Sequence, residues 1–259
     1  MSPTFAGIGD NLRIRANGLT QWVGIKNAPQ NQSLYADFRI RNRSGIGLSL
    51  YNDSNGNTSQ TGAKFSFAHH IILDYYSKQY LSFGLSYNIN SFKIDISKFN
   101  TTHEIPILDP SIINNRSITN NNFDVGLLYR NKGFYASLNA TNILPKSIDR
   151  FTGIEPSLLL NYQLYSGYVI KNSYNRNVEI EPSIFFQYFA GDQRSTTDVN
   201  IKYRRFNSYD DYYWAGVSYR FLNDQALNPL AVGPMAGFKK ANFYFGYSYQ
   251  ITLSQIRSE

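Results

Sequence analysis

The chain has 259 residues, no cysteine and a formal net charge of +7. This composition excludes a disulfide framework and thiolate chemistry, and no apolar run reaches the ~18 residues of a transmembrane helix. Charged residues make up only 17% and aromatic residues 16% of the chain, whereas a typical soluble domain is about 25% charged. The first residues, Met1 to Thr4, lack the basic and apolar regions of a signal peptide. An outer-membrane β-barrel, which this composition allows, must be exported, so on that interpretation we expect the amino-terminal end to lie outside this sequence.

Apolar and polar residues alternate with a period of two through most of the chain. The clearest case runs from Gln79 to Asn90. Such alternation predicts a β-strand with one apolar face and one polar face, but not which face is buried. The apolar set is Leu81, Phe83, Leu85, Tyr87 and Ile89, and the polar set is Ser82, Gly84, Ser86, Asn88 and Asn90.

The alternation predicts about 13 consecutive strands and no helix. Many of them reach about ten residues, the length that a tilted membrane strand needs, whereas strands of soluble proteins average about 5–6 residues. The predicted strands are 11–23, 32–41, 45–53, 59–72, 78–92, 122–130, 133–141, 157–170, 177–190, 194–206, 210–221, 229–238 and 241–251.

Short and long breaks alternate between these strands. The short set is 42–44, 74–77, 131–133, 171–176, 207–209 and 239–240, and it is rich in Lys and Arg. The other set is 24–31, 54–58, 93–121, 142–156, 191–193 and 223–228, of which only 191–193 is short. An up-and-down outer-membrane barrel has this asymmetry, with short periplasmic turns and longer outer loops. The basic residues are either a collar facing lipid phosphates or ordinary solvated turn charges.

The fold class predicted from these patterns is all-β, an up-and-down transmembrane antiparallel β-barrel that forms one domain over residues 1–259. Bacterial single-chain barrels have an even number of strands. The chain ends at Ile256-Arg257-Ser258-Glu259, without an aromatic closing strand. We therefore expect about 14 strands, the last of which is missing from this sequence.

Few residues suggest catalysis or metal binding. His69 and His70 are neighbours in one predicted strand, so they point to opposite faces and cannot share a metal. Glu179 and Glu181 would share a face, where acid–base chemistry is one interpretation and ion pairing with residues such as Arg204 or Arg220 is the favoured one. We predict no catalytic residue, no metal site and no cofactor.

Several short motifs, taken in chain order, resemble the PorP/SprF family. The first is Gln21-Trp22-Val23-Gly24 with Ala28-Pro29-Gln30, and the second is Gly45-Ile46-Gly47-Leu48-Ser49 with Asn52-Asp53. Later motifs are Leu81-Ser82-Phe83-Gly84-Leu85, Ile94-Asp95-Ile96-Ser97-Lys98 and Phe245-Gly246-Tyr247-Ser248-Tyr249. In the last of these, Gln250 stands where the family pattern has an acidic residue.

The resemblance implies an outer-membrane barrel of the type IX secretion system in Bacteroidota, associated with gliding motility and cell-surface adhesins. It implies a non-enzymatic protein that binds or anchors a secreted adhesin or other cargo through the cargo's C-terminal domain, or supports its secretion. Implied partners are this cargo, other type IX components such as the translocon or a periplasmic ring or lipoprotein, and outer-membrane lipid. The family brings no assigned catalytic or binding residues to this chain.

Loop length and aromatic placement suggest where a partner would bind. The expected contact residues are Trp22, Asn27 and Gln30 in the first loop, His103 and Arg116 in the long loop, and Ile148 and Phe151 in a later one. The alternative function is a passive outer-membrane pore or transporter for small solutes, which a polar inner face would support. A barrel enzyme lacks a visible nucleophile–His pair, and a nucleic-acid binder would cluster its basic residues rather than scatter them.

Overall fold

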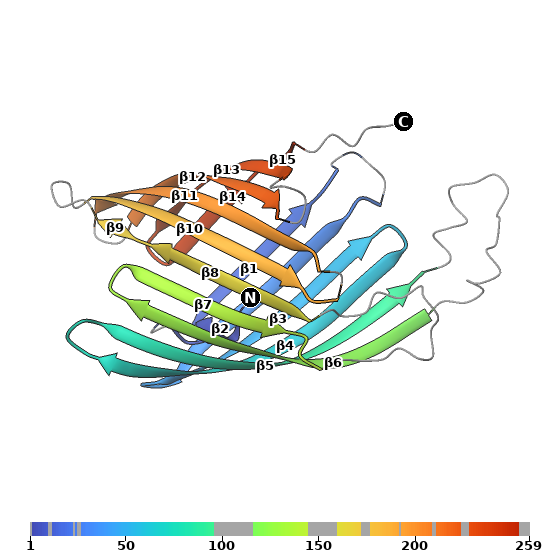
Figure 1. Ribbon diagram of the computed structural model, residues 1–259, viewed down its shortest axis with the longest axis horizontal. Helices are drawn as coiled ribbons and strands as arrows, with labels where there is room; N and C mark the ends of the chain where they lie inside the picture. The colour runs from blue at the N-terminus through green and yellow to red at the C-terminus, as the bar shows by residue number, and fades with distance from the viewer. Residues whose placement is uncertain are drawn as a thin grey trace. The chain divides into compact units, whose positions relative to one another are not determined.

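A computed structural model describes residues 2–9, 12–22, 24, 27–95, 116–144, 160–171, 177–191, 193–208, 211–223 and 228–253. The described part is a single antiparallel sheet with one short 3-10 helix, η1 (Pro3–Phe5) (Figure 1). No helix in these ranges is long and apolar enough to cross a membrane.

Consecutive strands pair with one another along the sheet, in the order β1 to β8 and then β10 to β14. The two-residue strands β9 and β15 lie off this path and pair with β10 and β13. The bounds are β1 (Arg13–Thr20), β2 (Gln30–Arg41), β3 (Ser44–Asn55), β4 (Thr58–Asp74), β5 (Gln79–Ile94), β6 (Arg116–Asn131), β7 (Phe134–Thr141), β8 (Asn161–Tyr168), β9 (Ile170–Lys171), β10 (Val178–Phe189), β11 (Ser195–Ser208), β12 (Asp211–Leu222), β13 (Asn228–Lys240), β14 (Phe243–Ser248) and β15 (Ile251–Thr252).

The predicted all-β, up-and-down antiparallel fold class is therefore confirmed. The thirteen strands on the main path correspond one to one with the predicted strands. The further closing strand stays a prediction.

The chain divides into two compact units. Unit 1 comprises 1–71 and 82–126, and unit 2 comprises 72–81 and 127–259. Unit 1 thus contains β1, β2 and β3, with most of β4 and β5 and the first part of β6. Unit 2 contains β7 to β15, the end of β6 and the turn between β4 and β5. The single domain expected over residues 1–259 stays a prediction.

Several predicted boundaries were wrong, and three of them change a turn or a strand start. The break at 54–58 shrinks to the two-residue turn Gly56-Asn57, because β3 and β4 stay paired as far as Asn55 and Thr58. The break at 93–121 ends earlier, since β6 begins at Arg116. The turn after β13 is Ala241-Asn242 rather than the two lysines before it, and Ala241 adopts a positive φ of 50° there.

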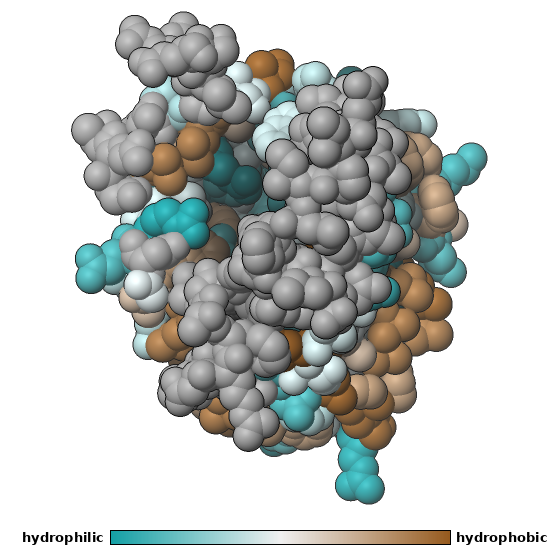
Figure 2. Space-filling view, turned by 90° about the vertical axis from the view of Figure 1, so that its right-hand side faces the viewer, coloured by the Kyte–Doolittle hydropathy of each residue, from teal (hydrophilic) through white to brown (hydrophobic). Residues whose placement is uncertain are grey.

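The structure shows which face of the alternating strands is buried. On β5, Ser82, Ser86 and Asn90 are buried, whereas Phe83 and Leu85 are about half exposed, at 47% and 48%. The same holds on β4, β10 and β11, and Figure 2 shows the hydrophobic residues, in brown, at the surface of the molecule. A soluble sandwich buries its apolar face, while a membrane strand turns it outward to lipid. The apolar face of this sheet therefore suits hydrocarbon.

β14 departs from this pattern. All six of its residues are exposed, including the small residues Gly246 and Ser248, which alternate with its aromatic residues. Among the described residues, β14 pairs only with β13, so it has neighbours on one side alone. That one-sided pairing is the physical reason for its exposure.

Candidate partner-binding sites

The first predicted contact residues lie together on the loop between β1 and β2. Trp22 is 58% exposed, Asn27 is exposed, and Gln30 is the first residue of β2. Trp22 and Asn27 have positive φ values of 49° and 60°. These left-handed conformations turn the loop and set its side chains outward.

Main-chain hydrogen bonds brace this loop. Gln21 N donates to Pro29 O at 2.9 Å, which closes the loop on itself. Gly56 N in the β3–β4 turn donates to Asn27 O at 3.1 Å. These two bonds tie Gln21 to Pro29 and Asn27 to the neighbouring turn.

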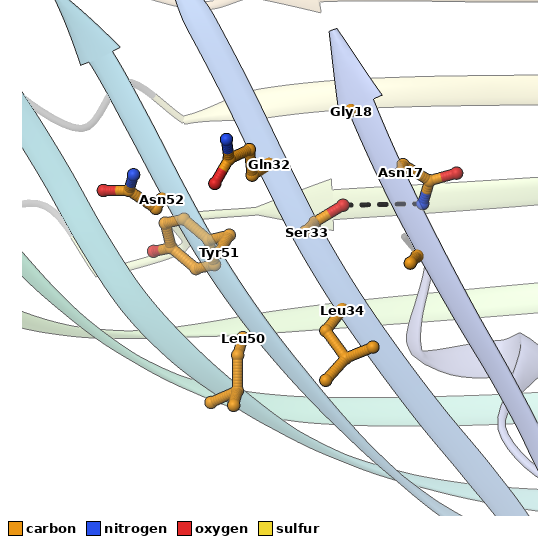
Figure 3. A pocket seen from close by; sticks show the side chains of 9 residues that line it. Asn17, Gly18, Gln32, Ser33, Leu34, Leu50, Tyr51 and Asn52 are labelled. Carbon is orange, nitrogen blue, oxygen red and sulfur yellow. Dashed lines mark hydrogen bonds between the residues drawn. The ribbon is translucent and has the colours of Figure 1, made fainter.

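A shallow hollow of about 550 Å³ lies beside this loop on β1, β2 and β3 (Figure 3). Leu34 and Leu50 are partners in the register of β2 and β3 and point the same way in Figure 3. Asn17 Nδ2 donates to Ser33 Oγ at 3.4 Å. The hollow has an apolar end and an amide-rich end, and it holds no cluster of charged groups.

The other predicted contact residues are less informative. Arg116 is the first residue of β6 rather than part of a loop. His103, Ile148 and Phe151 lie outside the described residues. The three first-loop residues lie on the connection from β1 to β2, and the proposed contact at each of the seven positions stays a prediction.

A second candidate site was missed by the sequence analysis. The stretch from Ser2 to Gly9, here called the 2–9 segment, lies on the polar face of unit 1 against β2 to β5. The residues that hold it are called the cradle. The cradle consists of Arg13, Asp37, Arg39, Gly45, His70 and Gly84.

The polar side chains of the cradle bind the main chain of the segment. Asp37, which is fully buried, accepts a hydrogen bond from Gly7 N at 2.8 Å. Arg13 Nη2 donates to Phe5 O at 3.0 Å and also pairs with Asp37. Arg39 donates to Gly7 O at 3.1 Å and to Ile8 O at 3.0 Å.

His70 completes this set from β4. Its Nε2 lies 2.9 Å from Ala6 O, and its Nδ1 lies 2.8 Å from Ser82 Oγ. Because a carbonyl oxygen only accepts, Nε2 carries the proton. His69 points to the other face and lies 3.0 Å from Ser44 Oγ, so the predicted separation of the two histidines is confirmed.

Glycines make room for the segment. A Cβ on Gly45 would lie 2.5 Å from Gly7 Cα, and one on Gly84 would lie 2.5 Å from Thr4 N. Both distances are below any ordinary contact, so only glycine allows the backbone to approach this closely. The sequence signal was Ser2-Pro3, a helix-start pattern that fits the observed Ser2 cap and Pro3 in η1.

The polar face of unit 2 is filled by charged side chains instead. Arg204 on β11 donates to Glu179 at 2.9 Å and pairs with Glu181, and Lys202 lies 3.3 Å from Glu181. The Tyr135 hydroxyl lies 2.7 Å from Glu181 Oε1. The favoured interpretation of the two glutamates as ion-pair partners of Arg204 is therefore confirmed.

Arg220 forms a different pair from the one expected. It binds Asp198 with two hydrogen bonds of 2.6 and 2.7 Å, because these residues are register partners on β12 and β11. Lys202 Nζ lies 5.5 Å from the centre of the Trp214 ring, which stacks on Tyr244. Within the described ranges, no three His, Asp or Glu side chains gather as a metal site would.

Lysines of the short turns border a hollow in unit 2. Its volume is about 710 Å³, and Lys78, Lys132 and Lys171 line it together with Arg204 and Glu179. Lys171 is mostly exposed and lies 3.5 Å from Glu179. Lysines near three short breaks thus line one hollow, and a collar facing anionic headgroups stays a prediction.

Comparisons with known proteins add the family. None of the curated proteins compared with the chain matches it. Among solved structures, the chain is similar to a crystal structure of BamA from Haemophilus ducreyi lacking POTRA domains 1–3, with a TM-score of 0.44 and 12% identity. That similarity covers 88% of this chain and 59% of the BamA chain.

The family match covers the whole chain. The family model described as type IX secretion system membrane protein PorP/SprF matches residues 1–259, which include every motif of the expected resemblance. The chain therefore belongs to the PorP/SprF family of type IX secretion system membrane proteins, a family of outer-membrane proteins with a β-barrel fold.

Proposed function

We propose that the protein is a non-enzymatic outer-membrane component that binds a secreted adhesin or other cargo, through the cargo's C-terminal domain, and anchors it at the cell surface. Family membership makes the chain a component of the type IX secretion system membrane machinery. Contact with the cargo would come from the connections of the longer set. Other secretion-system components and outer-membrane lipid would be its further partners.

The observation that supports this proposal is the braced first loop. An exposed tryptophan on a rigid backbone loses little conformational entropy on binding, and tryptophan is enriched among the residues that dominate binding energy. Trp22 is 58% exposed, and main-chain hydrogen bonds at Gln21 and Asn27 tie down residues on either side of it. Asn27 and Gln30 are exposed polar neighbours that suit the rim of such a contact.

The test is capture of cargo from native outer membranes. The tagged protein and its Trp22→Ala variant would be solubilised in detergent, purified and compared by quantitative mass spectrometry of the co-purifying proteins. We expect a secreted protein with a type IX C-terminal domain to co-purify, and its yield to fall about tenfold or more in the variant. Tyr76→Ala is the matched control, because Tyr76 is a 97% exposed aromatic in a turn of the short set.

The long connection between β5 and β6 provides a second test. Because β6 begins at Arg116, a replacement of 101–121 would also remove strand residues. Exchanging residues 101–115 for a short turn leaves β6 whole. Cargo capture should be lost while the barrel still folds, and undiminished capture would show that this connection is not a contact site.

The pore alternative predicts a different outcome. If the protein purifies without cargo and conducts ions in a planar bilayer, transport of small solutes replaces anchoring as its function. Co-purification of cargo that is lost in Trp22→Ala would contradict a function as a passive pore.

A further inference from the structure

The cradle binds main-chain atoms of its occupant rather than its side chains. Every cradle hydrogen bond to the 2–9 segment given above ends on a backbone atom, at Phe5, Ala6, Gly7 or Ile8. Any peptide can present the same N–H and carbonyl groups in the same turn. Side-chain identity matters only where the segment is buried, at Pro3, Thr4, Ala6 and Gly7.

The cradle side chains also bind one another. Asp37 pairs with Arg13, and Ser82 Oγ lies 2.8 Å from His70 Nδ1, so both would keep a partner if the segment left. The cradle residues lie on paired strands, whereas the 2–9 segment belongs to none of the strands. The segment can therefore leave without breaking the hydrogen-bond ladder of the sheet, and a preformed site binds without the cost of ordering itself.

We propose that the cradle is a peptide-binding site, which the 2–9 segment fills as an internal ligand and which takes a short peptide of a second protein in its place. The peptide it fits has small residues at the positions of Ala6 and Gly7 and a turn like that of η1. Pro3 and Thr4 set the preference at the other buried positions. This proposal does not depend on cargo capture by the first loop.

The experiment empties the cradle without altering it. Gly7 has a φ of +69°, and a Cβ there would lie 2.5 Å from Gly45 Cα, so Gly7→Ala should expel the segment. Release is followed through Thr4→Cys, because Thr4 is fully buried and the chain has no other cysteine. Its reaction with a water-soluble maleimide should be at least tenfold faster in Thr4→Cys/Gly7→Ala than in Thr4→Cys alone.

Binding is then measured with the full-length folded protein in detergent. The probe is a fluorescent peptide with the sequence of residues 2–9, and the readout is its anisotropy. The Gly7→Ala protein should bind it at least tenfold more tightly than wild type, whose tethered segment competes at high effective concentration. A peptide with alanine in place of its glycine at position 7 should not bind.

Two further variants keep the result interpretable. Gly7→Ala/Gly45→Ala should lose binding, because a Cβ at Gly45 would lie 2.6 Å from Ala6 O of the occupant. Gly7→Ala/Gly18→Ala is the matched control and should keep it, since a Cβ at Gly18 meets no atom within 4 Å. If Gly7→Ala fails to fold, Ala6→Leu expels the segment through its own buried side chain.

Two binding results would overturn the proposal. One is equal binding of the peptide by wild type and by the released variants. The other is release of the segment, shown by faster labelling, with no binding of the peptide to the emptied cradle. Unchanged labelling in both Gly7→Ala and Ala6→Leu would also overturn it, because the segment would then be a fixed part of the fold.

Discussion

The polar faces of the two units are covered by different kinds of groups. In unit 2, buried carboxylates meet cations on adjacent strands, and Glu179 with Arg204 and Asp198 with Arg220 are direct register partners. In unit 1, the Arg13–Asp37 pair is also in register, but much of the face is covered by the main chain of the 2–9 segment. Ion pairs between neighbouring strands are fixed by the pairing of those strands, whereas the 2–9 segment lies outside the sheet and can detach without breaking it.

The largest effect should come from breaking the unit 2 cluster. Arg204→Ala leaves Glu179 buried beside Lys171, and Glu181 buried beside Lys202 and the Tyr135 hydroxyl. Removing one partner of a buried ion pair lowers the free energy of unfolding strongly, here by about 4 kcal/mol. Urea unfolding in lipid vesicles, followed by tryptophan fluorescence, measures the loss. Arg220→Ala, whose arginine is half exposed, should cost far less, and an equal loss would show that burial of the pair is not what matters.

Replacing Asp37 in unit 1 should lower the free energy of unfolding by less than Arg204→Ala does. Its first effect should be local, at the 2–9 segment. Asp37→Ala removes the acceptor of Gly7 N and the partner of Arg13. We expect a loss of about 3 kcal/mol, since Arg13 keeps some solvent contact and the segment can leave. The urea transition should be preceded by faster maleimide labelling at Thr4→Cys. If labelling becomes faster only at the urea concentrations that unfold the whole protein, the two units do not differ in this way.

Crowding the unit 2 face near its end should have a smaller effect. A Cβ on Gly237 would lie 2.6 Å from Trp214 Nε1 and 2.1 Å from Phe245 O. Gly237→Ala should therefore lower the unfolding free energy by about 2 kcal/mol, as overpacked sites do. The same urea experiment on Gly18→Ala should show almost no change, and a loss there would point to backbone rather than packing effects.

The smallest effect should come from a neutral contact in unit 1. Ser66 and Ser86 share a buried hydrogen bond of 2.8 Å. Ser66→Ala should cost about 1 kcal/mol, because it leaves one hydroxyl without its partner. Adding Ser86→Ala should cost nothing more in the same urea titration, since both polar groups are then gone. An additive double variant would contradict a shared hydrogen bond.

The sequence was enough to predict the strands because a two-residue period repeats over spans of about ten residues. The β5 run from Gln79 onward shows this, with each polar and apolar residue on its expected side. It also predicted the pairing of Glu179 and Glu181 with Arg204. It could not predict the register that gives Arg220 to Asp198, because a one-residue shift changes every partner.

The cradle could not be predicted for a related reason. Its residues are far apart in the sequence, and the 2–9 segment carries no period that marks it as packed. Gly45 and Gly84 look like ordinary members of an alternating strand. Only the close approach of Gly7 and Thr4 gives these glycines their role.

The number of residues between two bonded residues suggests the order in which their contacts form during folding. Glu179 and Arg204 are 25 residues apart and Asp198 and Arg220 are 22, so each pair can form within one nascent hairpin. Ala6 and His70 are 64 residues apart, and their contact needs β4 in place. Because contacts between distant residues form more slowly, we expect the His70 contact of the 2–9 segment to form after the unit 2 pairs. A newly folded molecule would then pass through a stage in which its cradle is not yet filled.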